Sequence, residues 1–249
     1  SSSTITILNG QTVGTVTFTV KDDLLAEGTE TAVLTISSPS SDLVLGATTT
    51  QNITITDDDN SGTSNYTVPT AGAYRVVLTG GNLEIRNSSN DVVASRPVGT
   101  DALIINGTNG DDTLTIDYSA GNPLPLGGLT FNGGGETTAT GDVLNITGNA
   151  TPFSSVIVNH TGASSDGGAV TANGFDGNIV IDDGATRTIS FTGLEPINIG
   201  DATNILFNLT SGNDTGVTLA DAGSGQFTLN APSIESVTMD YPIAGGSLT

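Results

Sequence analysis

The chain lacks cysteine and tryptophan, and its 249 residues include one histidine and only 4% aromatic residues. Without cysteine there is no disulfide and no thiol chemistry. No apolar run is long enough to span a bilayer, so we expect no membrane insertion. The opening Ser1–Thr4 does not have the pattern of a signal peptide, so any secretion signal is expected outside this chain.

Positive charge is also scarce. Lysine and arginine number 5 against 26 aspartates and glutamates, which gives a net charge of −21. Nucleic-acid binding requires the opposite balance, and the same sign disfavours an anionic membrane surface. The acidic residues are scattered along the chain rather than collected in one tail, which argues against a disordered acidic arm.

Glycine (33 residues), threonine, serine and asparagine are abundant instead, a composition typical of short strands joined by turns. From residue 65 to 249, short alternating runs recur, such as 102–105, 113–118 and 143–146, and no helix of three turns is apparent. Such a pattern allows a sandwich, a barrel or a parallel β-solenoid. The number of runs and loose echoes, such as Asn109–Thr113 and Ser211–Thr215, favour a β-solenoid-like domain (parallel β-helix), with a second β-sandwich as the alternative.

Residues 1–59 are predicted to form strands at 4–8, 13–20, 31–36 and 51–56, with a tight turn at Asn9-Gly10, followed by a linker at 60–64. If 31–36 and 51–56 are antiparallel neighbours, the first begins and the second ends at the same pole of the sheet. Acidic residues cluster on both sides of this pole, namely Asp22, Asp23, Glu27 and Glu30, and Asp57, Asp58 and Asp59. Such crowding is unfavourable without a cation, and carboxylates with no nearby histidine or cysteine suit Ca²⁺.

This segment resembles the Calx-beta domain, an immunoglobulin-like sandwich. The likeness rests on three stretches, which are Asp22–Thr31 (DDLLAEGTET), Leu45-Gly46 and Ile53–Asp59 (ITITDDD). It implies a Ca²⁺ site with Glu27, Asp57, Asp58 and Asp59 as ligands and Asp23 and Glu30 as helpers. The match covers only the C-terminal half of such a domain. We therefore expect either that the chain continues a longer array or that another copy donates the missing strands.

The second part is similar in style to the β-helix-like repeats of very large bacterial cell-surface and adhesion proteins. One stretch, Asn106–Leu114, is also partly similar to the glycine-rich nonapeptide that binds Ca²⁺ in toxin-type β-rolls. Thr108 replaces the second glycine and no tandem copy follows, so a turn between strands is the favoured interpretation.

No catalytic constellation is evident. His160 has no paired acid beside it, and a surface or turn position is expected. Asp182, Asp183 and Arg187 could belong to a polysaccharide-cleaving β-helix, but aromatic platforms for a sugar are sparse.

The sequence therefore predicts a non-enzymatic, extracellular or cell-surface module with a structural or adhesive role, stiffened by Ca²⁺ at the junction near residue 60. Its expected partners are neighbouring modules, other copies of the chain or a cell-surface glycan. The alternatives are a polysaccharide-active or glycan-binding β-helix and a fibre subunit that assembles head-to-tail by strand exchange.

Overall fold

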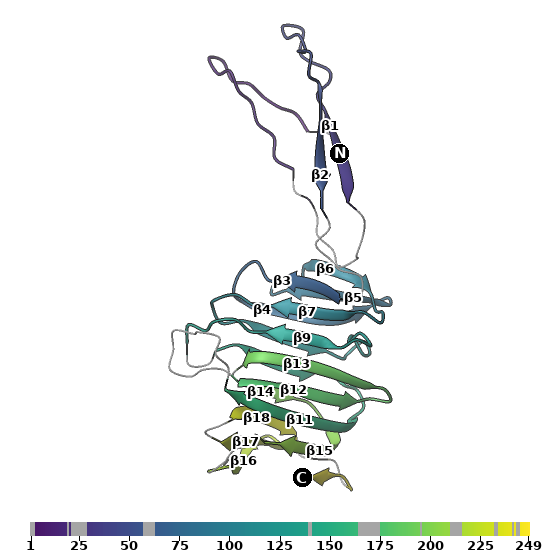
Figure 1. The fold of residues 1–249 in the computed structure, drawn as a ribbon, viewed down its shortest axis with the longest axis vertical. Helices are drawn as coiled ribbons and strands as arrows, with labels where there is room; N and C mark the ends of the chain where they lie inside the picture. The colour runs from purple at the N-terminus through teal and green to yellow at the C-terminus, as the bar shows by residue number, and fades with distance from the viewer. Residues whose placement is uncertain are drawn as a thin grey trace.

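The fold comes from a computed structural model, which describes residues 3–18, 20, 29–56, 63–138, 141–163, 175–194, 196–209, 216–231, 234–240, 242 and 245–249. These residues form an all-β structure with two large mixed sheets and no helix, so the predicted fold class is confirmed at that level. Within the described ranges, no helix is long and apolar enough to cross a membrane. The strands of the two large sheets follow one another along the long axis of the molecule (Figure 1).

The nine-stranded sheet has five parallel strands at its centre. In spatial order they are β18 (Ile234–Asp240), β14 (Ile197–Ile199), β10 (Val143–Thr147), β8 (Thr113–Asp117) and β4 (Ala73–Thr79). Antiparallel strands extend both edges, with β5 (Asn82–Asn87) and β6 (Val92–Pro97) beside β4, and β17 (Gln226–Ala231) and β16 (Thr218–Gly223) beside β18.

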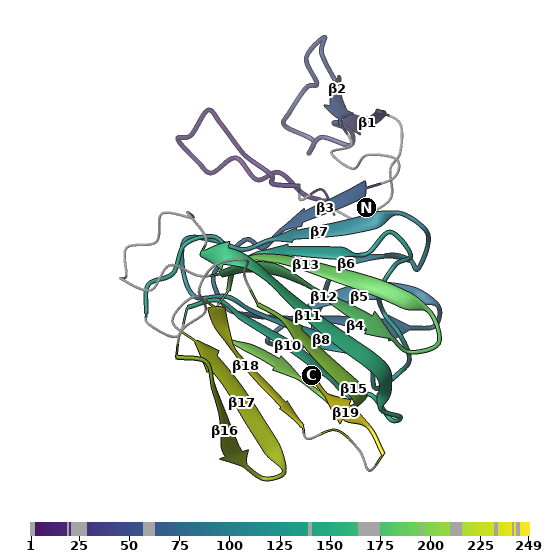
Figure 2. The ribbon, with the colours of Figure 1, turned by 60° about the horizontal axis from the view of Figure 1, so that its bottom comes forward.

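The eight-stranded sheet contains two parallel groups. The first is β3 (Thr63–Thr67), β7 (Ala102–Asn106), β9 (Leu129–Asn132) and β13 (Thr186–Leu194), and the second is β11 (Phe153–Ala163), β15 (Ala202–Asn208) and β19 (Ser247–Leu248). Strand β12 (Phe175–Asp182) lies between the groups and is antiparallel to both of its neighbours. Strands β16–β19 and the C-terminus lie together at the end of the stack that comes forward in Figure 2.

The chain passes repeatedly from one sheet to the other. Strands β3, β7, β9, β11 and β15 belong to the eight-stranded sheet, and each is followed by strands of the nine-stranded sheet or by a hairpin that leads there. Three antiparallel meanders interrupt this alternation, namely β4–β5–β6, β11–β12–β13 and β16–β17–β18. Because parallel neighbours need a crossover, returning through the opposite sheet lets short loops make connections that would otherwise need a helix.

Apolar residues alternate along each strand, so that every second side chain points inward. The register of the five parallel strands places these inward residues beside one another in two buried columns, Tyr74–Leu114–Leu144–Ile197–Val237 and Val76–Ile116–Ile146–Ile199–Met239. In the opposite sheet, Phe131 pairs with Phe191, and both are buried in the same continuous core. Burying each such side chain stabilises the fold by about 1.5–3 kcal/mol.

Asparagines on the outer faces form ladders across parallel and antiparallel neighbours. Asn159 on β11 donates to Asn178 Oδ1 (2.8 Å) and accepts from Asn208 Nδ2 (2.7 Å). Asn198 likewise donates to Asn145 Oδ1 (2.8 Å), and Asn132 to Asn106 Oδ1 (2.7 Å). An amide can donate to one rung and accept from the next, so the ladders reinforce the register that the core sets.

The N-terminal segment agrees with the prediction in part. Strands β1 (Glu30–Thr35) and β2 (Thr50–Ile55) form the expected antiparallel pair, and Gly10 has the positive φ of 81° that the Asn9-Gly10 turn needs. The strands expected at 4–8 and 13–20 are not formed by the described residues there. Apolar side chains remain exposed in this segment, among them Val13 (71%), Phe18 (50%) and Val33 (60%).

Alternation predicts a strand only where a second layer covers its apolar face. In the described part of residues 1–59, β1 and β2 are the only strands, so the partial sandwich stays a prediction. The linker predicted at 60–64 overlaps β3, which begins at Thr63. Its inward positions are Ser64 and Tyr66, and Ser64 Oγ accepts a hydrogen bond from Arg96 (2.8 Å). Because one inward residue is polar, the apolar alternation that predicts a strand is absent here.

Candidate functional site

The acidic pole predicted beside β1 and β2 is described only at Glu30. Glu30 is exposed and pairs with Ile55, so β1 begins and β2 ends at the same pole, as predicted. The other five predicted ligands, Asp23, Glu27, Asp57, Asp58 and Asp59, lie outside the described residues. The Ca²⁺ site at this pole therefore stays a prediction.

A second acidic cluster lies where β7, β9 and β13 end and the chain crosses to β8, β10 and β14. We call Asp111, Asp112, Glu136 and Asp142 the acidic corner. Strands β8 and β10 pair with Thr113 opposite Val143, which sets the two preceding residues, Asp112 and Asp142, beside each other. Asp112 is 2% exposed, Glu136 2% and Asp142 0%.

The first two acids of the corner are fully occupied. Asp112 accepts from Gly72 N at Oδ1 (2.8 Å) and from Thr108 N and Oγ1 at Oδ2 (2.7 and 2.9 Å). Asp111 accepts from the backbone N–H and hydroxyl groups of Thr137 and Thr138 (2.7–3.1 Å), which join the 107–112 loop to the 133–138 loop. Those hydrogen bonds, the Thr138 hydroxyl foremost, lower the pKa of Asp111 to about 2.

The other two acids have oxygens without a hydrogen-bonding partner. Asp142 Oδ1 accepts from Asp112 N (2.6 Å), but Asp142 Oδ2 and both carboxylate oxygens of Glu136 are buried and accept nothing. Burial first, and then the negative charges of Asp112, Asp111 and Glu136, raises the pKa of Asp142 to about 7. The two ion pairs in the described part of the chain, Arg75–Asp117 and Arg86–Glu84, involve none of the four acids.

Glycine allows the backbone at residue 133 to pack directly against Asp142. A Cβ on Gly133 would lie 2.5 Å from Asp142 Oδ2 and 2.6 Å from the carbonyl oxygen of Gly193. Both distances are too short for any side chain, so this close approach requires glycine and brings the two oxygens near each other. Among the described residues, no three histidine, cysteine, aspartate or glutamate side chains are grouped closely enough to hold a metal ion by themselves. Any cation here needs backbone oxygens as well.

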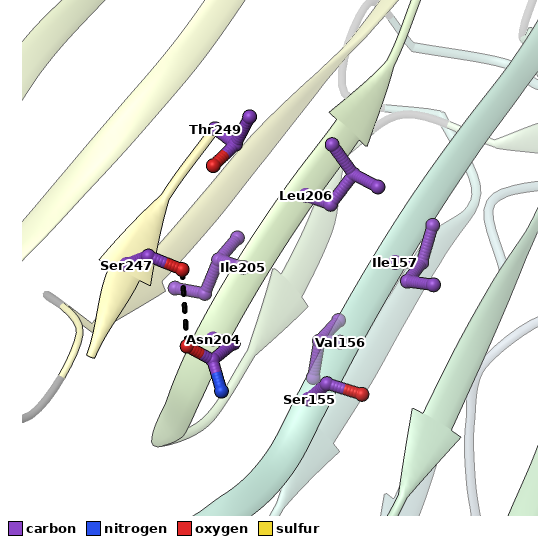
Figure 3. A pocket seen from close by; sticks show the side chains of 8 residues that line it. All are labelled: Ser155, Val156, Ile157, Asn204, Ile205, Leu206, Ser247 and Thr249. Carbon is purple, nitrogen blue, oxygen red and sulfur yellow. Dashed lines mark hydrogen bonds between the residues drawn. The ribbon is translucent and has the colours of Figure 1, made fainter.

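A pair of carboxylates also occurs in a surface hollow of about 300 Å³ near the C-terminal end. Burial, and then the neighbouring Asp240 carboxyl, raises the pKa of Asp201. Asn149, Asn198 and Gln226 contribute amides to the same lining, which has no aromatic residue. A second hollow of about 300 Å³ between β11, β15 and β19 has no acid; there Ser247 donates to Asn204 Oδ1 at 3.0 Å (Figure 3).

The residues considered for polysaccharide cleavage have local roles. Asp182 Oδ1 accepts from Gly184 N (2.9 Å) in the β12–β13 turn, and Asp183 Oδ2 accepts from Asn122 Nδ2 (2.8 Å). Arg187 donates to the Thr186 carbonyl (3.1 Å). The surface position expected for His160 is wrong, because it lies in β11 with 5% exposure and its ring meets Phe191 edge-on at 6.3 Å.

The sequence contains a pattern that marks the acidic corner but was not among the predicted sites. Asp112–Ile116 (DTLTI) and Asp142–Ile146 (DVLNI) repeat an acid before an alternating strand. The turn favoured for the 106–114 stretch is confirmed, because β7 ends at Asn106 and β8 begins at Thr113.

Comparison with protein-family models, with curated proteins and with solved structures found no match. The likenesses to the Calx-beta domain and to bacterial β-helix-like repeats therefore stay predictions.

Proposed function

We propose that the chain is a non-enzymatic structural or adhesive module of a long extracellular protein. In this proposal, residues 65–249 form a β-solenoid-like body interrupted by hairpins, and residues 1–59 form part of a Calx-beta-like sandwich. Ca²⁺ at the acidic pole stiffens the junction between them.

The observation that carries this proposal is the pair of buried columns that continue across five parallel strands. Each strand contacts mainly its two neighbours, so length can grow without changing the local structure. Such a stack suits a stalk or spacer, because bending it would pull packed core residues apart and would also break the hydrogen bonds between the ladder amides. A net charge of −21 also fits a solvated surface that resists self-association in bulk.

Small-angle scattering of the full chain tests the function. With millimolar Ca²⁺ we expect a longer and stiffer particle than in EDTA, because carboxylates that repel one another at the root of the junction would be held together. Identical profiles would contradict the junction mechanism. The matched control is the pole variant, Asp57→Asn combined with Asp58→Asn and Asp59→Asn, whose profile should not respond at the junction.

A polysaccharide-active or glycan-binding module is the second candidate, and the Asp201–Asp240 pair favours it. Two carboxyl groups that share one site can serve as acid and base. Against this, the hollow lacks the aromatic surface that sugar binding usually requires. Release of reducing ends from acidic polysaccharides, abolished by Asp201→Asn, would favour the enzyme, whereas no turnover would favour the structural module.

Strand exchange between copies is a third candidate, and the exposed apolar residues of the N-terminal segment favour it. Ile7 (47%), Val13 (71%) and Val44 (95%) offer surface that a donated strand could cover. Fibres formed by the purified chain alone, visible by electron microscopy, would support this assembly. A monomer at all concentrations would contradict it.

A further inference from the structure

We propose that the acidic corner binds a hard divalent cation, Ca²⁺, through Asp142 and Glu136, with the Gly193 carbonyl oxygen as a backbone ligand. This site is distinct from the predicted pole beside β1 and β2. Its residues belong to β13 and to the connection between β9 and β10.

The first argument concerns buried carboxylate oxygens that have no hydrogen bond. Asp142 Oδ2 and both oxygens of Glu136 are buried without a hydrogen bond. Leaving a carboxylate oxygen buried and unpaired is costly, and native proteins almost always satisfy such groups. A proton on Asp142 would satisfy one oxygen and leave the Glu136 carboxyl as it is. One cation between the two side chains would satisfy both.

The second argument is the absence of an internal counter-charge. The carboxylate oxygens of Asp111 and Asp112 accept hydrogen bonds from backbone and threonine donors, and the negative charges of both groups still act on Asp142. No described arginine is ion-paired with any acid of the corner. Within the described ranges the corner therefore concentrates buried negative charge that no ion pair offsets, and a cation from solution would offset it.

The third argument is the proximity of oxygen ligands. Asp142 Oδ2 and the Gly193 carbonyl oxygen lie close to each other, because a Cβ built on Gly133 would be 2.5 Å from the first and 2.6 Å from the second. The proposed ligands are all oxygens, with no histidine or cysteine among them, which suits Ca²⁺ rather than zinc or copper. Two carboxylates and a carbonyl are fewer than the six to eight ligands that Ca²⁺ takes, so water would complete the shell.

The ligands are not those of the nonapeptide that 106–114 partly resembles. Asp112, its acidic residue, already accepts three hydrogen bonds, and Glu136 and Asp142 lie outside that stretch. A cation held by the β9–β10 and β13–β14 connections would tie two successive crossovers to each other. Its expected effect is to stabilise the middle of the stack rather than the junction near residue 60.

The test uses the full chain in the background of the pole variant, so that the two proposed Ca²⁺ sites are separated. Ca²⁺ is titrated calorimetrically at pH 7.5, and melting temperatures are compared in EDTA and in millimolar CaCl₂. Asp142→Asn and Glu136→Gln are then added singly. The matched control is Asp42→Asn, which removes the same charge from an exposed loop.

We expect the pole variant and its Asp42→Asn derivative to release binding heat and to melt at a higher temperature with Ca²⁺. Asp142→Asn and Glu136→Gln should each abolish both responses. In EDTA both should melt no lower than their parent, because each removes a buried negative charge. Gly133→Ala should abolish binding while retaining both acids; if it fails to fold, the two acid variants decide the question.

Three outcomes would overturn the proposal. The pole variant could show no response to Ca²⁺, or the acid variants could bind as well as their parent. MgCl₂ could also match CaCl₂, which would remove the assignment to Ca²⁺. Failure of the pole site alone would appear as identical titrations of the wild type and the pole variant, and it leaves the corner standing.

Discussion

The asparagine ladder on β12, β11 and β15 offers a quantitative test of the register. Asn159 is the middle rung, half-buried, with one hydrogen bond to Asn178 (2.8 Å) and one from Asn208 (2.7 Å). A hydrogen bond of this kind contributes about 0.5–1.5 kcal/mol net. Asn159→Ala should therefore lower the free energy of unfolding by about 1–3 kcal/mol. Asn208→Ala, an exposed end rung, should cost only one bond, about 0.5–1.5 kcal/mol.

Urea denaturation of the two single variants and the double variant measures the coupling between the rungs. The Asn159–Asn208 bond is lost in either single variant, so the double variant should be more stable than additivity predicts by about 0.5–1.5 kcal/mol. The urea midpoint should move while the slope stays constant. Effects that add to within about 0.3 kcal/mol would mean that the two amides are not bonded, and the parallel register of β11 and β15 would be refuted.

Three further predictions concern the core, the corner and the hollow. Ile146→Ala should cost about 2–5 kcal/mol in urea denaturation, because Ile146 is fully buried in a central column, whereas Leu219→Ala on exposed β16 should change stability by under about 0.5 kcal/mol; equal effects would contradict the core assignment. In EDTA, stability should fall as pH rises from about 4 to about 7, because folded Asp142, with a pKa near 7 against a usual 3.8, keeps a proton that the unfolded chain releases. The fall is at most about 4 kcal/mol, and Asp142→Asn should flatten thermal melts across this range; an unchanged slope would contradict it. Asp201→Asn should raise stability slightly at pH 8, measured by melting temperature, since it removes one of two adjacent negative charges; a lower melting temperature would mean that the Asp201 carboxylate has a partner worth more than the repulsion.

The sequence predicted strands well where alternation was clean and less well elsewhere. Ala102–Asn106 (ALIIN) and Val143–Thr147 (VLNIT) carry apolar residues at every inward position, and both are strands close to the predicted bounds. Ile197–Ile199 was not predicted as a strand because it has three residues between Pro196 and Gly200, too few to show an alternating pattern. Thr63–Thr67 was not predicted because its inward Ser64 is polar and accepts a hydrogen bond from Arg96, which lies 32 residues later.

The pairing of the strands could not be predicted from alternation. An alternating pattern indicates which face of a strand is buried, but it does not indicate which strand lies beside it. The β-solenoid-like expectation rested on run counts, and nothing in them foretold that β12 and β13 would turn back and pair antiparallel in the middle of the eight-stranded sheet. Those hairpins obscure any fixed repeat length, which explains why the echoes between distant phrases were loose.

The acidic corner shows how such pairing creates chemistry from residues that look unrelated along the chain. Asp112 and Asp142 are 30 positions apart, and each alone is an ordinary acid before a strand. The register of β8 and β10 sets them side by side, and the loop that begins at Gly133 brings Glu136, which is also buried, close enough for its charge to act on Asp142. The same pairing that builds apolar columns inside the sheets therefore places like charges next to each other where β8 and β10 begin. A neutral ladder such as Asn159–Asn208 is stable by itself, whereas a charged one needs an outside ion, so the corner is where the stability of this fold should depend most on solution conditions.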